Sequence, residues 1–253
     1  MAQKASNQEP TRALAKAGKV VEVLAGENDI EPSEITERCD IPRSSAYRIL
    51  DGLANVGLVE SSGAVAYSLS LGWLGLADAA RRSLTEWRGS AEVLAELTAE
   101  VGVTSFLSLV FGEETICVEC AQGRGIDELI LGPGGTLPFY GGAAGRVALA
   151  YSNPDVIDAY LAKAPFRGYN LNTLVTETEL RQDIERTREL GYAFSDEDVT
   201  IGVCSVGVPL FRGDSPYAVA SLSLGGFIDY VKPNRDRLAE TLRRYADRLM
   251  TGL

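Results

Sequence analysis

The sequence predicts an α+β protein with a small helical domain at its start and a larger domain built on an antiparallel sheet. The first 70 residues read as three short helices followed by two strand-like runs. An apolar helical stretch comes next, and the rest alternates β-rich runs with helices. We therefore expect domains at residues 1–70 and 90–253, joined by a linker helix at residues 71–89.

Three helices are expected in the first domain, at residues 11–25, 31–39 and 43–56. Apolar residues recur three or four positions apart in the first and third, and Pro32 lies near the first helical position of the second. Gly57 ends the third helix. The runs 58–61 and 64–69 flank Ser62-Gly63 as a hairpin. This order is that of a winged helix-turn-helix, which places one helix in the major groove of DNA.

The stretch from Leu71 to Trp87 is expected to be a helix with apolar residues over much of its circumference. Such a helix needs a partner. Two interpretations remain open: the helix is buried in its own domain, or it is a linker that pairs with a second subunit.

The second domain is expected to hold an antiparallel sheet of about six strands, because its β-rich runs are separated by glycine or proline breaks and by helices. Strands are expected at residues 104–111, 114–121, 127–132, 192–199, 202–211 and 217–224. Helices are expected at residues 90–100, 141–150, 155–163, 177–190 and 234–250.

Composition excludes several classes of protein. The 253 residues are 45% hydrophobic and 23% charged, which is typical of a globular chain. No run reaches the roughly 18 apolar residues that a membrane span needs, and the first ten residues lack the apolar core of a signal peptide, so we expect a cytoplasmic protein without a membrane partner. The chain has no histidine, which excludes His-based triads and His-ligated zinc. No cofactor or metal is expected.

Four cysteines, Cys39, Cys117, Cys120 and Cys204, are expected to be reduced structural thiols. Cys117 and Cys120 form a C-x-x-C pattern, but they lie in one predicted strand. Residues three apart on a regular strand point to opposite faces. This pair is therefore not expected to chelate a metal.

Three stretches of the sequence carry a resemblance to a known family. They are Arg43 to Leu50 with Leu53 and Gly57, Leu137 to Arg146 before Leu149-Ala150, and Gly191 to Asp198 leading to Gly202 to Phe211. With these stretches the whole chain resembles the IclR family of transcription regulators. The last stretch matches the family's C-terminal signature at Gly191, Ser195, Ser205, Val206, Gly207, Leu210 and Phe211.

The resemblance implies a GAF-like effector domain after the DNA-binding domain, a homodimer or homotetramer, and a repressor beside catabolic genes. The chain departs from the family's usual residues at several positions. Asp198 stands where the family usually has glutamate, and Tyr140 stands where it has histidine. Arg146 stands in place of lysine, and Arg212 in place of glycine or a small polar residue. Positions 195 and 205 are serines here, whereas relatives often have aspartate and cysteine there. These changes concern the ligand more than the fold.

The predicted DNA-binding residues are Arg43, Ser44, Ser45, Tyr47 and Arg48, which lie off the core stripe of the third helix. Arg48 is suited to guanine, and the serines and Tyr47 to phosphates. Residues 1–70 nevertheless carry a net charge of −3 within a total of −11. The wing, Ser61-Ser62-Gly63-Ala64, has no cation and is expected to contact DNA weakly. A solvated helix face is the alternative interpretation.

The predicted effector site joins a glycine-rich helix start to four serines, and its members are Gly142, Ala143, Ala144, Gly145, Ser195, Ser205, Ser221 and Ser223. The resemblance places these residues at one pocket. Free N–H groups at a helix start hold carboxylates, so the expected effector is a small organic acid. Its apolar part is expected near Leu129, Leu131, Phe139 and Tyr140. With serine at position 195, we expect a ligand with few hydroxyl donors. Serines that pair only with the sheet backbone are the alternative interpretation.

Two other classes of function remain open. The carboxylates of Asp196, Glu197 and Asp198 suit acid–base catalysis or a cation site, but no nucleophile or second acidic motif lies at a readable spacing, so no enzyme activity is expected. A ligand-binding module that acts on a protein partner is the other alternative. A mobility-shift assay with DNA separates these classes, because an enzyme shows turnover without a shift.

Overall fold

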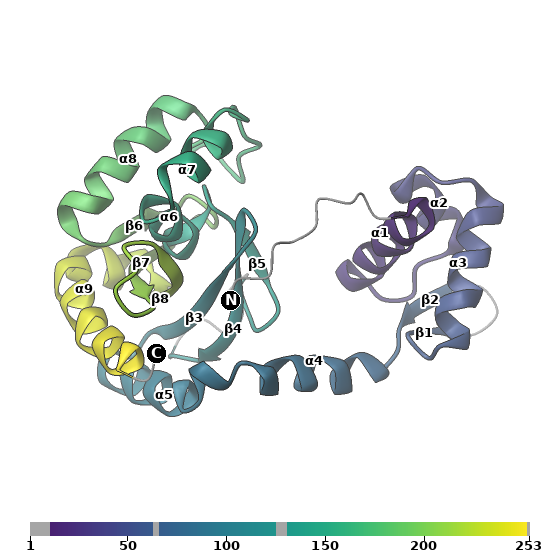
Figure 1. The fold of residues 1–253 in the computed structure, drawn as a ribbon, viewed down its shortest axis with the longest axis horizontal. Coiled ribbons are helices and arrows are strands. Elements are labelled where there is room, and N and C mark those ends of the chain that lie inside the picture. The colour runs from purple at the N-terminus through teal and green to yellow at the C-terminus, as the bar shows by residue number, and fades with distance from the viewer. Residues whose placement is uncertain (1–10, 63–65, 125–130, 252–253) are drawn as a thin grey trace. The chain divides into compact units, whose positions relative to one another are not determined.

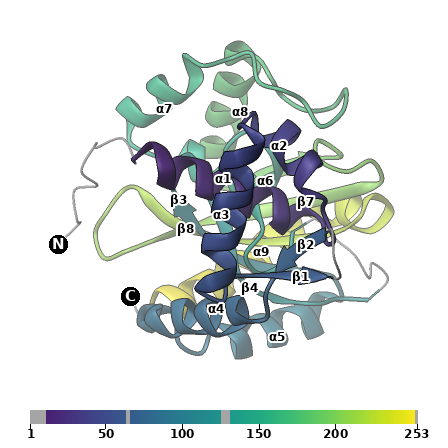
Figure 2. The ribbon, with the colours of Figure 1, turned by 90° about the vertical axis from the view of Figure 1, so that its right-hand side faces the viewer.

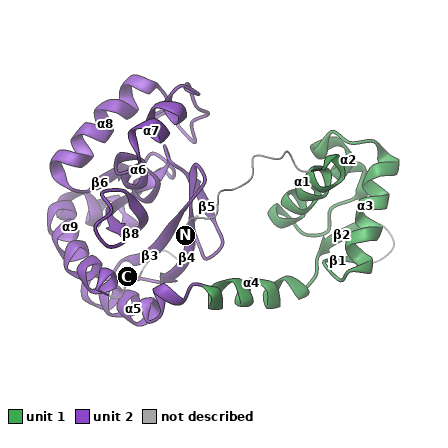
Figure 3. Ribbon diagram, in the orientation of Figure 1, with its two compact units in different colours: residues 1–83 green, residues 84–253 purple. Residues whose placement is uncertain are grey.

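The computed structural model describes residues 11–62, 66–124 and 131–251 (Figure 1). The chain divides into two compact units, Met1–Ser83 and Leu84–Leu253 (Figure 3).

The first unit contains the predicted winged helix-turn-helix. Its elements are α1 (Arg12–Gly26), α2 (Pro32–Cys39), α3 (Arg43–Asn55), β1 (Val59–Ser62) and β2 (Ala66–Leu69). All three helices bury one apolar face in a shared core, to which Val20, Ile35 and Leu50 contribute fully buried side chains. The expected helix order and the antiparallel pairing of β1 with β2 are confirmed. The turn at Gly63 and Ala64 lies outside the described residues.

Asp29 fastens the β1–β2 hairpin to the helices. Its carboxylate accepts hydrogen bonds from the hydroxyls of Ser62 and Ser68, and its backbone N–H donates to the Ser68 Oγ at 2.9 Å. The next residue, Ile30, forms a backbone bridge with Tyr67. The hairpin is therefore tied to the segment before α2 at both of its strands.

The linker helix is shorter than predicted. α4 spans Gly72–Ser83, and a single 3-10 turn, η1 (Thr85–Trp87), follows Leu84. The Ser83 hydroxyl donates to the carbonyl of Ala80, a local bond that competes with helix continuation. Trp87 is buried in the core of the second unit. No described residue of α4 is buried, although the indole N–H of Trp73 donates to the Leu58 carbonyl at 2.6 Å.

The second unit is the predicted α+β domain with an antiparallel sheet. Over the described residues, the sheet has six strands in the order β5-β4-β3-β8-β7-β6, and every neighbouring pair is antiparallel. The strands are β3 (Thr104–Phe111), β4 (Glu114–Ala121), β5 (Thr136–Pro138), β6 (Ala193–Asp196), β7 (Val203–Phe211) and β8 (Ala218–Phe227). The helices are α5 (Ser90–Val101), α6 (Gly142–Ala150), α7 (Pro154–Leu161), α8 (Glu177–Leu190) and α9 (Ile228–Met250).

Two boundaries differ from the expectation. The strand predicted at residues 127–132 lies mostly outside the described residues, and its described part, Leu131 and Gly132, is not strand. The edge strand is instead β5, whose three residues are too few to show a periodicity. α9 begins at Ile228 rather than Asn234, because Pro233 lies inside the helix instead of before it.

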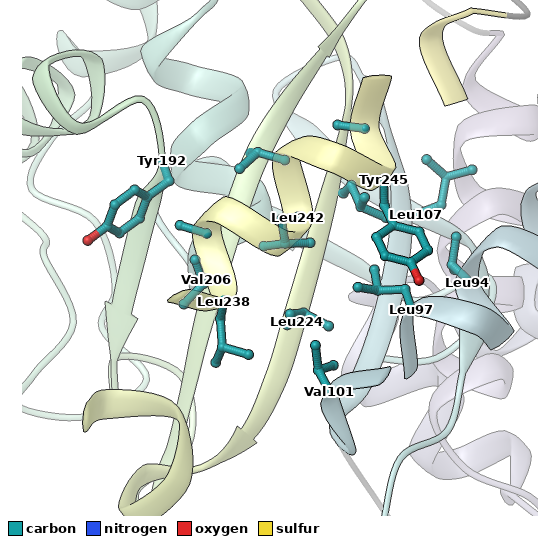
Figure 4. Packing of buried hydrophobic residues seen from close by; sticks show 14 of the residues in the cluster. Leu94, Leu97, Val101, Leu107, Tyr192, Val206, Leu224, Leu238, Leu242 and Tyr245 are labelled. Atoms are coloured by element: carbon teal, nitrogen blue, oxygen red, sulfur yellow. The ribbon is translucent and has the colours of Figure 1, made fainter. Parts of the chain in front are cut away.

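The two faces of the sheet have different chemistry. One face carries Leu107, Val206 and Leu224, which pack against leucines of α5 and α9 in the largest core of the unit (Figure 4). α7 and α8 lie on the other side of the sheet from α5 (Figure 2). That side of the sheet carries small and hydroxyl-bearing residues: across β7 and β8, Gly207 pairs with Ser223 and Ser205 pairs with Gly225.

α6 approaches this second face at backbone-contact distance. A Cβ added at Gly207 of β7 would lie 2.9 Å from the carbonyl oxygen of Ala143. Real Cβ atoms essentially never come so close, so glycine is required at this point. The contact brings the first turn of α6 directly against the sheet.

Cys117 and Cys120 do not point to opposite faces of the sheet, so this prediction is wrong. A β-bulge shifts the register of β4 between these residues, so Cys117 pairs with Ser108 and Cys120 pairs with Phe106. Ser108 and Phe106 lie two residues apart on β3 and thus share a face. The two cysteines therefore face the same side of the sheet. Neither forms a disulfide, and Cys117 is buried.

Candidate functional site

The predicted DNA-binding residues lie on one side of α3. Arg43, Ser44, Tyr47 and Arg48 are exposed, and Ser45 is half-buried. The opposite side of the helix buries Ala46 and Leu50 in the core. The 3.6-residue periodicity thus separated the outward-facing residues from the core correctly.

The two arginines of α3 differ in their contacts. The Arg43 guanidinium lies 5.6 Å from the ring centroid of Tyr47 and donates to its hydroxyl at 3.4 Å. Among the described residues, Arg48 makes no hydrogen bond or ion pair. Arg43 is therefore held against the helix surface, whereas Arg48 is available to an external acceptor.

Arg38 of α2 is already paired with acidic residues of the same unit. Arg38 forms ion pairs with Glu27, at 2.8 Å, and with Glu34. On the hairpin, the described residues of β1 and β2 include no lysine or arginine, and the Asp29 carboxylate contacts both strands. The cations that α3 itself presents are Arg43 and Arg48.

A cavity of about 70 Å³ lies between the start of α6 and the hydroxyl-bearing face of the sheet. Six of the eight predicted effector residues line it: Gly142, Ala143, Ala144, Ser195, Ser205 and Ser223. Ser195 and Ser205 are directly paired across β6 and β7, and Ser223 comes from β8. No charged side chain of the described residues lines this cavity.

The first turn of α6 leaves backbone donors at the cavity. The helix has no side-chain cap at its start. The N–H of Ala143 donates to the Ser205 Oγ at 3.1 Å. The N–H groups of Gly142 and Ala144 also belong to the first turn, where a helix offers no backbone acceptor. An anionic group in the cavity would meet both of these donors and the positive end of the helix dipole.

Two predicted residues are not brought to the cavity. Gly145 serves packing, because a Cβ at this position would lie 2.4 Å from the carbonyl oxygen of Pro138. Ser221 is fully buried, farther along β8, where it pairs with Ser108 of β3. The side-chain oxygens of Ser221 and Ser108 have no hydrogen-bond partner among the described residues.

The apolar lining is mostly different from the one expected. Leu131 lines the cavity as predicted, and Leu129 lies outside the described residues. Phe139 is instead fully buried in a separate cluster, and Tyr140 stacks on Phe166 at a centroid distance of 4.8 Å. The apolar positions that sequence reasoning missed are Phe106, Leu137, Val199 and Val203. Phe106 pairs with Ser223, so the missing signal was the register between β3 and β8.

Arg146 forms a buried ion cluster behind the cavity. Its guanidinium donates to Asp183 at 2.8 Å and to Asp198 at 2.9 Å. Burial alone would lower the pKa of Arg146, but hydrogen bonds to the two carboxylates outweigh it and raise the pKa, so the guanidinium stays charged. Asp198 also accepts the hydroxyl hydrogen of Ser195. The cluster thus joins α6, α8 and the segment after β6 to one cavity residue.

The three consecutive carboxylates at residues 196–198 have separate structural partners. Asp196 forms an ion pair with Lys232 at 2.8 Å. The Glu197 carboxylate accepts the N–H of Gly202 at 2.7 Å, while Asp198 belongs to the Arg146 cluster. These carboxylates therefore do not converge on one point as an acid–base pair or a cation cage would require.

Cys204 is an unreactive thiol. It lies on β7 in the core, and burial raises its pKa to about 12 with a further contribution from its hydrogen bond to Asp196. A thiol with so high a pKa is not ionised near neutral pH. Cys39 is also buried, and burial raises its pKa.

Models of one protein family match both units. The IclR helix-turn-helix domain matches residues 13–63, and the C-terminal domain of the bacterial transcriptional regulator IclR matches residues 87–251. The second match begins at the buried Trp87 and includes the cavity and the Arg146 cluster.

Three similar proteins each match more than four fifths of this chain. An HTH-type transcriptional regulator of Mycobacterium tuberculosis is 31% identical over 210 residues, which cover 82% of this chain and 79% of that protein. The transcriptional repressor IclR of Escherichia coli is 23% identical over 222 residues, covering 84% and 79%. The crystal structure of an IclR homolog from Microbacterium hydrocarbonoxydans, complexed with 4-hydroxybenzoate, has a TM-score of 0.78 at 22% identity and covers 95% of this chain and 98% of that one.

We expect Arg146→Met to lower the free energy of unfolding by about 3–5 kcal/mol, because it leaves Asp183 and Asp198 as buried carboxylates without a cation. Arg146→Lys should lose less, since it keeps the charge but not the forked geometry. Urea unfolding followed by circular dichroism measures both. Arg181→Met is the control, because Arg181 makes exposed ion pairs with Asp158 and Glu177. Equal losses in Arg146→Met and the control would contradict a buried, energetically coupled cluster.

Proposed function

The chain belongs to the IclR family of bacterial transcriptional regulators, and from this premise we propose that it binds operator DNA through α3 under the control of a small organic acid in the cavity of its second unit. The family consists of regulators with a helix-turn-helix domain and a C-terminal effector domain, not of enzymes. The observation that carries the proposal is the start of α6, whose N-cap residue supplies no side-chain cap, at a cavity that no charged side chain of the described residues lines. A DNA partner also supports the cytoplasmic location expected from the sequence.

DNA recognition is assigned to the exposed side of α3. Arg48 is free to form a bidentate contact with guanine, the commonest specific contact in the major groove. Arg43, held against Tyr47, and the serines Ser44 and Ser45 at the start of the helix are suited to phosphate oxygens. The first turn of α3 has no side-chain cap, so its N–H groups add donors for a phosphate.

The proposal includes a dimer or a dimer of dimers, which the charge of α3 and the exposure of α4 support. One α3 presents two arginines, and binding to DNA depends on the number of phosphates neutralised. A dimer doubles that number. α4 has no buried described residue, and Leu71, Leu74 and Leu76 are more than half exposed. This exposure favours the second interpretation of the linker helix, pairing with another subunit.

The effector is assigned to the class of small organic acids. A carboxylate at the start of α6 would accept hydrogen bonds from the N–H groups of Gly142 and Ala144 and from the hydroxyls of Ser205 and Ser223. No carboxylate of the described residues lines the cavity to repel it. The binding of 4-hydroxybenzoate by a homolog of the same fold supports an acid.

For the acid to regulate DNA binding, it must bind with different affinity to the conformation that binds operator DNA and to the conformation that does not. By thermodynamic reciprocity, operator DNA changes the affinity for the acid by the same factor. The name of the Escherichia coli relative supports repression, in which occupied operator DNA blocks transcription. A catabolic operon is the expected target, because a small acid is a suitable signal of a degradable carbon source.

We expect Arg48→Ala and Arg43→Ala to weaken DNA binding differently. After an operator is selected from a random library, Arg48→Ala should weaken the free energy of operator binding by about 1–3 kcal/mol and reduce the preference for one base at a single position. Arg43→Ala should weaken binding to all DNA sequences. It should also reduce the slope of the logarithm of the binding constant against the logarithm of the salt concentration by about one. Fluorescence anisotropy over a salt series measures both, with Arg181→Ala as the control. Equal losses on operator and random DNA for both variants would contradict the assignment.

We expect the full chain to be a dimer or tetramer at micromolar concentration, and Leu74→Glu or Leu76→Glu to shift it toward the monomer, because a charge would be buried in the α4 interface. Sedimentation analysis measures the distribution. Gly75→Ala is the control on the same helix, since its added Cβ meets no atom within 4 Å. A 27.1 kDa monomer for the native chain would end the oligomer proposal.

We expect calorimetry of the full chain against a panel of small acids to find binding that is lost in the corresponding amides. Ser205→Ala and Ser223→Ala should each weaken binding about 10- to 100-fold, as expected for one hydrogen bond to a charged group. Ser152→Ala is the control, because its hydroxyl donates to the Ala148 carbonyl. Equal affinity for an acid and its amide would contradict a carboxylate site at α6.

A further inference from the structure

Ser195 and Ser205 present opposite hydrogen-bonding groups to the same cavity. They are directly paired across β6 and β7, so both side chains lie on one face of the sheet, with Cβ atoms about 5 Å apart. Both line the cavity. Each already makes one hydrogen bond to the protein, and these bonds run in opposite directions.

Ser195 can only accept a hydrogen bond from a ligand. Its hydroxyl hydrogen is donated to Asp198, which is almost fully buried and ion-paired with Arg146 at 2.9 Å. A carboxylate in an ion pair has no hydrogen to return, so the direction of the Ser195 bond is fixed. The hydroxyl oxygen keeps lone pairs for the cavity.

Ser205 is free to donate to a ligand. Its oxygen already accepts the N–H of Ala143 at 3.1 Å, which occupies a lone pair. Among the described residues no acceptor takes its hydroxyl hydrogen. Ser205 therefore acts with the N–H groups of Gly142 and Ala144 as a donor set at the start of α6.

We propose that this fixed polarity selects a short hydroxycarboxylate, with its carboxylate at Ser205 and the α6 start and its hydroxyl donating to the Ser195 Oγ. The inference rests on the proposed function and names the class of acid. A ligand with a keto group in place of the hydroxyl would direct its oxygen lone pairs at the lone pairs of the Ser195 Oγ, which is unfavourable. A ligand with a methyl group there would offer the Ser195 Oγ no hydrogen-bond donor. The direction of this bond reverses the expectation from the sequence that Ser195 favours a ligand with few hydroxyl donors.

The size of the cavity limits the acid to a small molecule. A site for one water needs about 10–15 Å³ by the same kind of measure, so about 70 Å³ holds on the order of five water-sized groups. The distance of about 5 Å between paired side chains suits a carboxylate and a hydroxyl on the same or neighbouring carbons. A 2-hydroxy or 3-hydroxy acid of three or four carbons meets both limits.

The experiment compares matched acids by calorimetry on the full chain. One series is lactate, 2-methylpropanoate and pyruvate, and the other is 3-hydroxybutanoate, 3-methylbutanoate and acetoacetate. Within at least one series, the hydroxy acid should bind about 3- to 10-fold more tightly than the methyl acid, as one net hydrogen bond provides. The keto acid should bind no better than the methyl acid.

Two variants distinguish an effect of the Ser195 hydrogen-bond direction on ligand preference from a general loss of protein stability. Asp198→Asn replaces the obligate acceptor by an amide that can donate to Ser195, which frees the Ser195 hydrogen for the ligand. The preference should then move toward the keto acid. Asp183→Asn is the matched control, because it makes the same charge change at Arg146 but leaves the Arg146–Asp198–Ser195 chain in place. It should keep the preference for the hydroxy acid.

Ser195→Ala should abolish the preference for the hydroxy acid while acids still bind through the α6 start. Thermal unfolding of each variant establishes that the binding data come from folded protein. If acids bind but hydroxy and methyl acids bind equally, or if Ser195→Ala or Asp198→Asn keeps the native preference, the inference is overturned and the acid site stands. If no acid in either series binds the folded native chain, the inference and the assignment of the cavity to small acids both fail.

Discussion

The close approach of α6 to β7 is the constraint on which the second unit depends. Because Gly207 has no side chain, the carbonyl of Ala143 lies where a Cβ would otherwise be, and the first turn of the helix reaches the sheet. The N–H groups of that turn then open onto a cavity instead of solvent. A larger residue at position 207 would lift the helix and separate its donors from Ser195, Ser205 and Ser223.

Charge inside this unit is placed behind the cavity. Arg146 extends from α6 to Asp183 and Asp198, so the helix that supplies the backbone donors also anchors α8 and the segment after β6. Of the described cavity residues, Ser195 is the one whose hydroxyl bonds to this Arg146 cluster, through Asp198. A buried guanidinium can thus influence which ligand atoms are accepted without lining the cavity, since it fixes the direction of a neighbouring hydrogen bond.

Local patterns predicted most of the fold, whereas register and tertiary contacts did not follow from them. Apolar periodicity was sufficient for α1 and α3, the position of Pro32 for α2, and β-rich runs bounded by glycine or proline for β3, β4 and β7. Six of the eight proposed effector residues meet at the cavity. Gly145 instead packs against Pro138, and Ser221 is buried farther along β8. Neither contact can be seen in a pattern of residues along the sequence. Phe106 and the shared face of the two cysteines depend on strand register and on a bulge, which no local spacing reveals.

The attachment of the hairpin through Asp29 bears on the thermodynamics of DNA recognition. The described strands of the hairpin are held to the segment before α2 by two serine hydroxyls and a backbone bridge, so these strands are already positioned in the absence of DNA. Little conformational entropy is then lost when the hairpin meets a groove. For a reading head with few cations, such preorganisation preserves affinity that electrostatic attraction alone would not supply, and it leaves that affinity less sensitive to ionic strength.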